Sequence, residues 1–324
     1  MSNHLIDCLE NKVLSGEDIT IDEAKELAQL EGLDLYQLFA AAARIRDVRA
    51  GKNVDLCSII NAISGNCTED CKYCAQSGHY QAQVEIYGLL DEETILARAR
   101  QMEAAGAARF SLVTSGRDIA EEDFSKVLAI YRRLALETNL KLCASLGIIT
   151  QEMAEELVKV GVIMYHHNLE TAASYFPQIC TTHTYEERVA TIKAAQRAGM
   201  EVCSGGIISM GESMEQRFEL AFALKELGIN SVPINILHPI KGTALEGQPL
   251  LPPLEILKTI AIFRFILPEA KLRFAGGREN ALGDLLALGY MAGINASLVG
   301  SYLTTSGRSV AADIKLIKDL GLVV

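Results

Sequence analysis

The feature that most constrains the fold is a regular alternation of short apolar runs with amphipathic stretches from residue 55 onward. Most neighbouring runs are separated by one helical pattern of about 10–16 residues. Eight such β–α units, at a period of about 30–40 residues, predict an α/β fold of the TIM-type (β/α)8 barrel kind. The predicted strands occupy 56–62, 108–113, 140–147, 162–170, 200–208, 229–237, 271–277 and 295–300.

The helical stretches repeat one design. In the stretch DEETILARARQMEAAG, residues 91–106, an acidic start precedes apolar side chains at helical spacing, and a glycine ends the pattern. The stretches 184–199 and 211–228 follow the same plan. No low-complexity stretch or long linker interrupts the series, so we expect a single domain overall.

The first 50 residues form a predicted helical segment that precedes a barrel over residues 51–324. Thr20 and Glu23 fit a capping box, and apolar residues at helical spacing follow them. A second helix is predicted over 34–51, ending near a glycine. We expect this segment to cover one end of the barrel.

Composition narrows the function classes. The chain has 324 residues, 49% of them hydrophobic, which is enough for a sizeable core. The formal net charge is -11 and no Lys/Arg cluster stands out, so we expect no nucleic-acid partner. The N-terminal stretch has no long apolar run, and we expect neither a signal peptide nor a membrane anchor. The expected location is the cytoplasm, where eight cysteines are not expected to form a disulfide framework.

Three of the cysteines form a C-x3-C-x2-C triplet, which predicts a metal centre. Cys67, Cys71 and Cys74 follow the first predicted strand, where a barrel enzyme carries functional loops. Three thiolates can hold three corners of a [4Fe–4S] cluster and leave the fourth iron open to a ligand. The alternative is a zinc ion held by the same cysteines and a histidine, for which His79 is the nearest candidate.

This triplet after the first strand of a barrel resembles the radical S-adenosylmethionine (SAM) superfamily. The resemblance implies that the open iron binds the amino and carboxylate groups of SAM. Electron transfer from the cluster then cleaves SAM into methionine and a 5′-deoxyadenosyl radical, which abstracts hydrogen from unactivated C–H bonds.

Five further stretches are similar to the biotin synthase family, in the same order and over nearly the whole chain: GNCTEDCKYCAQSGHY, YHHNLET, VCSGGI, SVPINIL and LRFAGGRE. The resemblance implies insertion of sulfur into dethiobiotin to give biotin, with reduced flavodoxin or ferredoxin as electron donor and a homodimeric assembly. Two alternatives stay open. One is another radical SAM enzyme, of the hydrogenase-maturation or methylornithine-forming kind, and the other is a non-catalytic iron–sulfur or zinc protein.

Residue parity and the resemblance together predict the binding residues. His166, Asn168 and Glu170 share one parity in the fourth predicted strand, so they face the same side. The family likeness implies that Asn168 and Glu170 contact SAM and that Asn235 binds the ureido group of the substrate. His166 is a further substrate candidate. The remaining predicted SAM contacts are Tyr73, Thr114, Ser115, Gly116 and His183.

An auxiliary iron–sulfur cluster is the second metal site that the resemblance implies. Its familiar [2Fe–2S] form uses three strand cysteines and an arginine, and Cys143, Cys203 and Arg273 match three of these ligands. The expected cysteine of the second strand is replaced by Ser111. Cys57, on the first strand, has a parity that can point into the barrel.

We therefore predict a variant whose auxiliary cluster is held by Cys57, Cys143 and Cys203, with Arg273 also at the site. It is predicted to be larger than [2Fe–2S], with four irons, and to carry an extra sulfide as sulfur donor. One alternative is a [2Fe–2S] cluster, and another is that Cys57 is a packed core thiol and this cluster is lost. Cys180, in the loop after the fourth strand, is a weaker ligand candidate.

Overall fold

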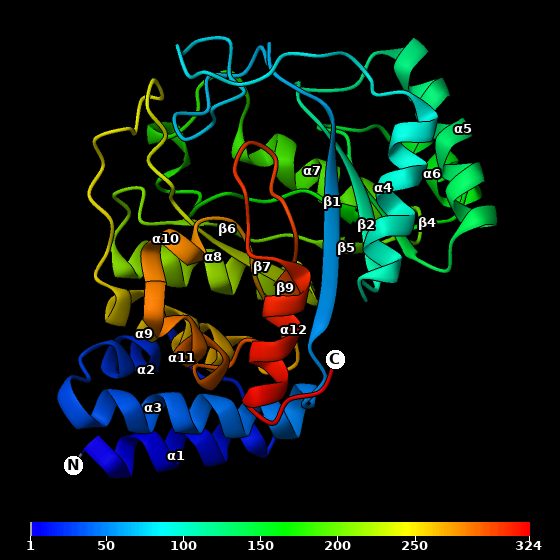
Figure 1. Ribbon diagram of the computed structural model, residues 1–324. Helices are drawn as coiled ribbons and strands as arrows, with labels where there is room; N and C mark the ends of the chain where they lie inside the picture. The colour runs from blue at the N-terminus through cyan, green and yellow to red at the C-terminus, as the bar shows by residue number, and fades with distance from the viewer. Residues whose placement is uncertain (1) are drawn as a thin grey trace.

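A computed structural model of the chain describes residues 2–324, with side chains from residue 4, so that residue 1 of the predicted helical segment lies outside the described residues. All strands pair in parallel in one sheet that closes on itself, because β7 pairs with both β5 and β6. The predicted (β/α)8 barrel is confirmed (Figure 1). The strands are β1 (Asp55–Ile63), β2 (Arg109–Thr114), β3 (Lys141–Ser145), β4 (Val162–His166), β5 (Glu201–Cys203), β6 (Gly206–Ile208), β7 (Ser231–Ile236), β8 (Lys271–Phe274) and β9 (Ala296–Leu298).

Ser204 and Gly205 divide the fifth predicted strand into β5 and β6. The barrel therefore has nine strands by label, although β5 and β6 together occupy one of its eight strand positions. A Cβ atom on Gly205 would lie 2.0 Å from the carbonyl oxygen of Pro233 in β7. A Cβ atom on Gly206 would lie 2.5 Å from the carbonyl oxygen of Glu170. Glycine is therefore required where β5 and β6 approach both neighbouring segments.

Helices cover the outside of the barrel, and the capping chemistry of the sequence sets several of their starts. Thr184 and Ser213 form capping boxes at the starts of α7 and α8, and Asp91 caps α4. The helices after β1 are α4 (Glu92–Ala104), α5 (Glu121–Glu137), α6 (Gln151–Lys159), η2 (Phe176–Gln178), α7 (Tyr185–Arg197), α8 (Met214–Glu226), α9 (Pro253–Ile266), α10 (Arg278–Leu282), η3 (Gly283–Leu285), α11 (Leu286–Met291) and α12 (Val310–Asp319).

Three helices precede the barrel: α1 (Ser2–Leu14), α2 (Ile21–Ala28) and α3 (Gly32–Ile45), the last continued by the π-helical turn η1 (Arg46–Ala50). The predicted capping box of Thr20 and Glu23 is confirmed at the start of α2. The helix α3 packs against α1, α9 and α11, and its apolar face joins the core of the barrel. These helices lie at one end of β1, and the cysteine loop lies at the other (Figure 1).

Candidate active site

The cysteine triplet lies in the loop after β1, at the mouth of the barrel. Gly65 and Asn66 have φ values of 78° and 50°, which turn the chain out of β1. Within the loop, the amide of Cys67 donates to the carbonyl of Gln76 at 3.0 Å, and the amide of Cys74 donates to the carbonyl of Cys71 at 3.0 Å. All three cysteines line one pocket of about 260 Å³, so the loop presents its thiols to a shared cavity.

This first pocket also gathers most of the predicted SAM contacts. Besides the cysteines and Tyr73, it is lined by Thr114–Gly116 at the end of β2, by His166–Asn168 and Glu170 at the end of β4, and by His183 and Arg188. Three buried polar atoms around it have no hydrogen-bond partner among the described residues: Thr114 Oγ1, His167 Nε2 and Arg188 Nε. Buried polar atoms are normally paired, so these three fit a polar molecule in the pocket. An amino acid head and a ribose, as in SAM, have the donors and acceptors to satisfy them.

Glu170 is held in a strained position by its neighbours. Its φ is 72°, which is rare for a residue other than glycine. Its amide donates to the carbonyl of Gly205 at 3.1 Å, and its carbonyl accepts from the amide of Ile207 at 2.8 Å. Burial raises the pKa of the Glu170 carboxyl, against the opposing effects of Arg188 and of the hydrogen bond from Tyr73. The strand itself ends at His166, so Asn168 and Glu170 lie just beyond β4 rather than on it as predicted.

A second pocket, of about 280 Å³, adjoins the first and shares Tyr73, Asn168 and Glu170 with it. Asn235 of β7 lines this pocket. Its amide oxygen accepts from the amide of Gly276 at 3.0 Å, and its Nδ2 donates to the carbonyl of Gly206 at 3.3 Å. These bonds fix the orientation of the Asn235 amide and leave one of its N–H groups for a ligand.

His166 lines the first pocket and not the second. It lies in register with Cys203 of β5. Burial lowers the pKa of His166 to about 3, and the positive charges of Arg273 and Arg109 add to this effect. The imidazole is therefore neutral at physiological pH.

The interior of the barrel brings the predicted auxiliary-cluster residues together. Cys57, Cys143 and Cys203 are buried, and Cys143 and Cys203 pack against the same residue, Met164. Cys57 and Cys143 come from the two strands that flank β2. The influence of the Cys143 thiol lowers the pKa of Cys57, and that of Cys57, together with burial, raises the pKa of Cys143. Ser231 donates to Cys203 Sγ at 3.2 Å.

Ser111 occupies the position on β2 between two of these strands. It pairs in register with Ile59 of β1 and with Cys143 of β3. Its hydroxyl is buried and donates only to the carbonyl of Leu112 at 3.4 Å. The register therefore places Ser111 on the inner face of the wall, beside Cys143.

Sequence reasoning missed a group of ionised side chains below these thiols. Asp55 accepts from Arg273 Nη2 at 2.7 Å, from Arg109 Nε at 3.1 Å and from Lys271 Nζ at 3.1 Å. Nη1 of Arg109 is buried without a partner. Arg273 thus has an anion on one side and the thiols on the other. Burial raises the pKa of Cys203, and the charge of Arg273 opposes this effect. The pKa of Cys57 is lowered by Cys143 and further by Arg273. The signal in the sequence was the presence of charged residues that share the parity of the interior residues, at or near the start of three strands, β1, β2 and β8.

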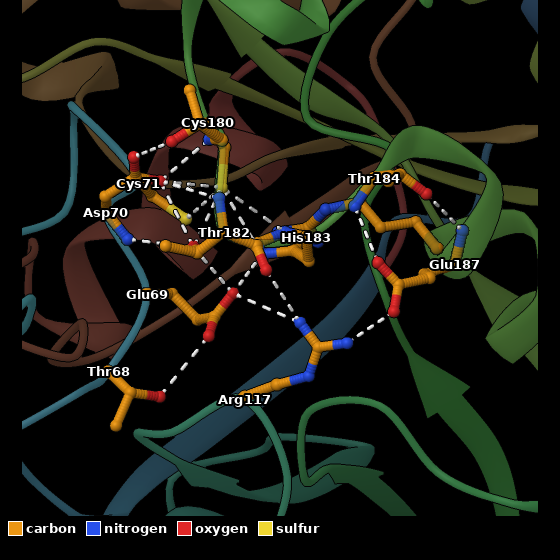
Figure 2. A network of polar contacts seen from close by, with 12 residues as sticks. Thr68, Glu69, Asp70, Cys71, Arg117, Cys180, Thr182, His183, Thr184 and Glu187 are labelled. Atoms are coloured by element: carbon orange, nitrogen blue, oxygen red, sulfur yellow. Dashed lines mark hydrogen bonds and ion pairs between the residues drawn. The ribbon is translucent and has the colours of Figure 1, made fainter.

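Cys180 lies away from the interior thiols, beside the cysteine loop (Figure 2). Its Sγ is 3.7 Å from Cys71 Sγ and 3.3 Å from His183 Nδ1. The hydrogen bond from Cys71 and then that from His183 lower the pKa of Cys180 to about 4, although burial opposes them. In the sequence, the signal for this group was the C-x2-H spacing of Cys180 and His183.

His79 does not join the cysteines. Its Nε2 lies 2.9 Å from the carbonyl oxygen of Thr68, and the side chain is exposed. The geometry therefore gives no support to the zinc alternative in which His79 is the fourth ligand.

Comparisons with known proteins agree with this geometry. Residues 61–224 match the family described as the Radical SAM superfamily, and residues 233–323 match the Biotin and Thiamin Synthesis associated domain. Among solved structures, methylornithine synthase superposes with a TM-score of 0.84 at 21% identity, covering 97% of this chain and 96% of that one. The FeFe-hydrogenase maturase HydG from Carboxydothermus hydrogenoformans gives 0.81 at 18% identity, covering 99% and 79%. Identities this low show a shared fold alone.

The fold, the cysteine loop at the barrel mouth and the family match define a radical SAM enzyme. Relatives named biotin synthase are far more similar in sequence. That from Heliobacterium modesticaldum is 60% identical, over 97% of this chain and 96% of its own length. That from Carboxydothermus hydrogenoformans is 57% identical over 99% of both chains. The chain belongs to the biotin synthase family.

The comparisons thus decide against the two alternatives of another radical SAM chemistry and a non-catalytic metal protein. Among the described residues, no helix is both long and apolar enough to cross a membrane.

Proposed function

We propose that this chain catalyses insertion of sulfur into dethiobiotin to form biotin. The observation that carries the proposal is the arrangement of three sites along the barrel. The cysteine-lined first pocket adjoins the second pocket through a common wall of Tyr73, Asn168 and Glu170, and three interior thiols lie deeper in the barrel. A family membership supported by 60% identity over nearly the full length agrees with this reaction.

In the first pocket, Cys67, Cys71 and Cys74 would hold a [4Fe–4S] cluster with one iron open to SAM. When bound, this cluster and SAM supply the radical that removes hydrogen from the substrate. The residues around the pocket bind and orient SAM. Glu170 and Asn168 offer a carboxylate and an amide for the ribose hydroxyls, and the unpartnered Thr114 hydroxyl faces the pocket with Ser115 and Gly116.

In the second pocket, Asn235 would bind the ureido ring of dethiobiotin through its free N–H group. The apolar side chains of Ile59, Ile207 and Leu298 also line this pocket and would contact the hydrocarbon part of the substrate. Because the two pockets share part of their lining, a substrate in the second pocket would have its carbon atoms next to the SAM site. His166 lines only the first pocket, so we assign it to the boundary with the interior rather than to direct substrate contact.

In the interior, Cys57, Cys143 and Cys203 would hold an auxiliary cluster of four irons. Three thiolates suit a four-iron cluster with one open iron, which would carry an extra sulfide as sulfur donor. The burial of all three thiols, the charge of Arg273 and the unpartnered Arg109 Nη1 support an anionic group there. The role of this chain's residues is to hold that group, neutralise its charge and exclude water.

The test is an anaerobic assay of the purified chain with dethiobiotin, SAM, a reductant and a sulfide source. Biotin, detected by mass spectrometry, is the expected product. Cleavage of SAM without biotin would overturn the sulfur-insertion proposal. The Asn235→Ala variant is expected to raise the KM for dethiobiotin, while SAM binding is retained.

The proposal extends to the cellular setting. We expect reduced flavodoxin or ferredoxin as the electron donor, a homodimer and a cytoplasmic location. Eight free cysteines among the described residues suit a reducing compartment. Analytical ultracentrifugation of the purified chain measures the predicted dimer.

A further inference from the structure

A second set of metal-ligand atoms lies directly behind the cysteine loop. Cys71 Sγ, Cys180 Sγ and a ring nitrogen of His183 all lie within 4.8 Å of one another. The side chains come from two loops more than 100 residues apart and point toward one another (Figure 2). All three residues are buried, so the group is a formed cluster inside the protein and not a chance encounter at the surface.

The distances within this group match the edges of a tetrahedral metal site. With Zn–S bonds of about 2.3 Å, two sulfur ligands lie about 3.8 Å apart, and a sulfur and a nitrogen ligand lie about 3.6 Å apart. The Cys71 and Cys180 sulfurs are 3.7 Å apart. Cys180 Sγ is 3.8 Å from His183 Nε2 and 3.3 Å from Nδ1. The three ligand atoms are therefore as close to one another as the ligands of one ion, and the imidazole has to rotate to direct Nε2 between the sulfurs.

A buried carboxylate selects the histidine tautomer that a metal ligand requires. Glu69 Oε2 accepts a hydrogen bond from His183 Nδ1, and a carboxylate acceptor assigns the proton to Nδ1. Nε2 is then the nitrogen with a free lone pair. Histidine ligands of metals are commonly held this way by a carboxylate on the other nitrogen. Thr182 donates to the same Glu69 oxygen at 2.8 Å and fixes its position.

Asp70 secures the loop that carries Cys180. Its Oδ1 accepts from the amides of Thr181 and Thr182 at 2.8 Å and 3.2 Å. The same oxygen lies 3.2 Å from Cys180 Sγ. The two loops are thus joined by Glu69 and Asp70, the two residues that precede Cys71, and these contacts hold the ligand atoms near one another.

We propose that Cys71, Cys180 and His183 bind a single divalent transition-metal ion, Zn²⁺ or Fe²⁺, when the four-iron cluster is not assembled. Cys71 belongs to both ligand sets, so the single ion and the cluster exclude one another. A site of two thiolates and an imidazole binds Zn²⁺ more tightly than Fe²⁺. Zinc at this site therefore blocks assembly of the cluster. Ferrous iron at the same site instead lies next to the cysteines that hold the four-iron cluster.

Zinc binding to the full-length chain, freed of clusters under anaerobic conditions, tests the site without SAM or substrate. We expect Cys180→Ser to lose about one tightly bound Zn²⁺ per chain, and Glu69→Gln to weaken that ion about 10–100-fold. Co²⁺ bound in place of Zn²⁺ reports the coordination geometry, because a tetrahedral thiolate complex of cobalt has characteristic visible absorption bands. Cys8→Ser, which changes an exposed thiol on α1, is the matched control and keeps the full zinc content.

A second measurement compares the effects of the two metals on assembly of the iron–sulfur cluster. The chain is loaded with Zn²⁺ or with Fe²⁺ and then given iron and sulfide. We expect zinc to slow formation of the iron–sulfur absorption at least about tenfold in the wild-type chain and not in Cys180→Ser. Equal zinc affinity in wild type and Cys180→Ser would overturn the proposal. Should Cys180→Ser fail to fold, Glu69→Gln carries the test, since it keeps all three ligands.

Discussion

Replacing Cys57 with alanine tests the interior site through a count of iron. Two sites of three thiolates each, both filled by four-iron clusters, give about eight irons per chain after anaerobic reconstitution. Cys57, Cys143 and Cys203 are all buried, and loss of Cys57 leaves only two of the three interior thiols that we propose as ligands. We therefore expect Cys57→Ala to retain about four irons. Iron and sulfide analysis with Mössbauer spectra makes the measurement.

A rescue variant sharpens this test. Ser111 lies in register beside Cys143, where the familiar form of the family has a cysteine. In the double variant Cys57→Ala with Ser111→Cys, we expect a [2Fe–2S] cluster in the interior and about six irons per chain. Cys8→Ala is the control and keeps about eight. An unchanged iron content in Cys57→Ala would refute the assignment of Cys57 as a ligand.

Three further predictions concern single residues. Because burial raises the pKa of Glu170 above its usual 4.5, its ionisation destabilises the fold at neutral pH, and this penalty fades as the pH falls toward 4.5. Glu170→Gln should therefore raise the free energy of unfolding by roughly 1 kcal/mol at pH 7, as measured by thermal melts between pH 5.5 and 8. The same variant should weaken SAM binding by about 1.5–3 kcal/mol, as measured by calorimetric titration. A variant less stable than the wild-type chain would contradict this reasoning. Gly205→Ala should destabilise the chain by about 3 kcal/mol or more in urea unfolding, because the added Cβ would lie 2.0 Å from the Pro233 carbonyl oxygen. Gly247→Ala is the control and should have little effect, because an added Cβ there would have no atom within 4 Å. Asp55→Asn should cost about 3–5 kcal/mol by the same measurement, since three cations share this carboxylate, whereas the exposed Asp319→Asn should cost less than about 1 kcal/mol.

Most of the barrel could be predicted from the sequence because its signals are local. Each of the eight apolar runs contains a strand, and Thr20 and Glu23 mark the start of α2 as a capping box. The division of the fifth strand was not predicted. It depends on the contact of Gly205 with Pro233 of another strand, which no local pattern reveals.

Part of the first pocket could also be predicted from the sequence. The triplet of Cys67, Cys71 and Cys74 is a local motif, and its place after the first strand put it at the barrel mouth. Asn168 and Glu170, which share one parity in the sequence, both line the first pocket, as does His167 of the opposite parity. Local patterns could not give the positive φ of Glu170, because hydrogen bonds to Gly205 and Ile207 impose it from a neighbouring strand.

The sequence by itself thus determined the barrel, the family and the cysteine loop, since these rest on periodicity and short motifs. Tertiary structure alone decided which distant side chains meet. It brought Cys180 and His183 to Cys71, and it gathered Arg109, Lys271 and Arg273 around Asp55. Such contacts depend on strand register and on the approach of separate loops. Both are set by packing of the whole barrel rather than by any segment of the chain.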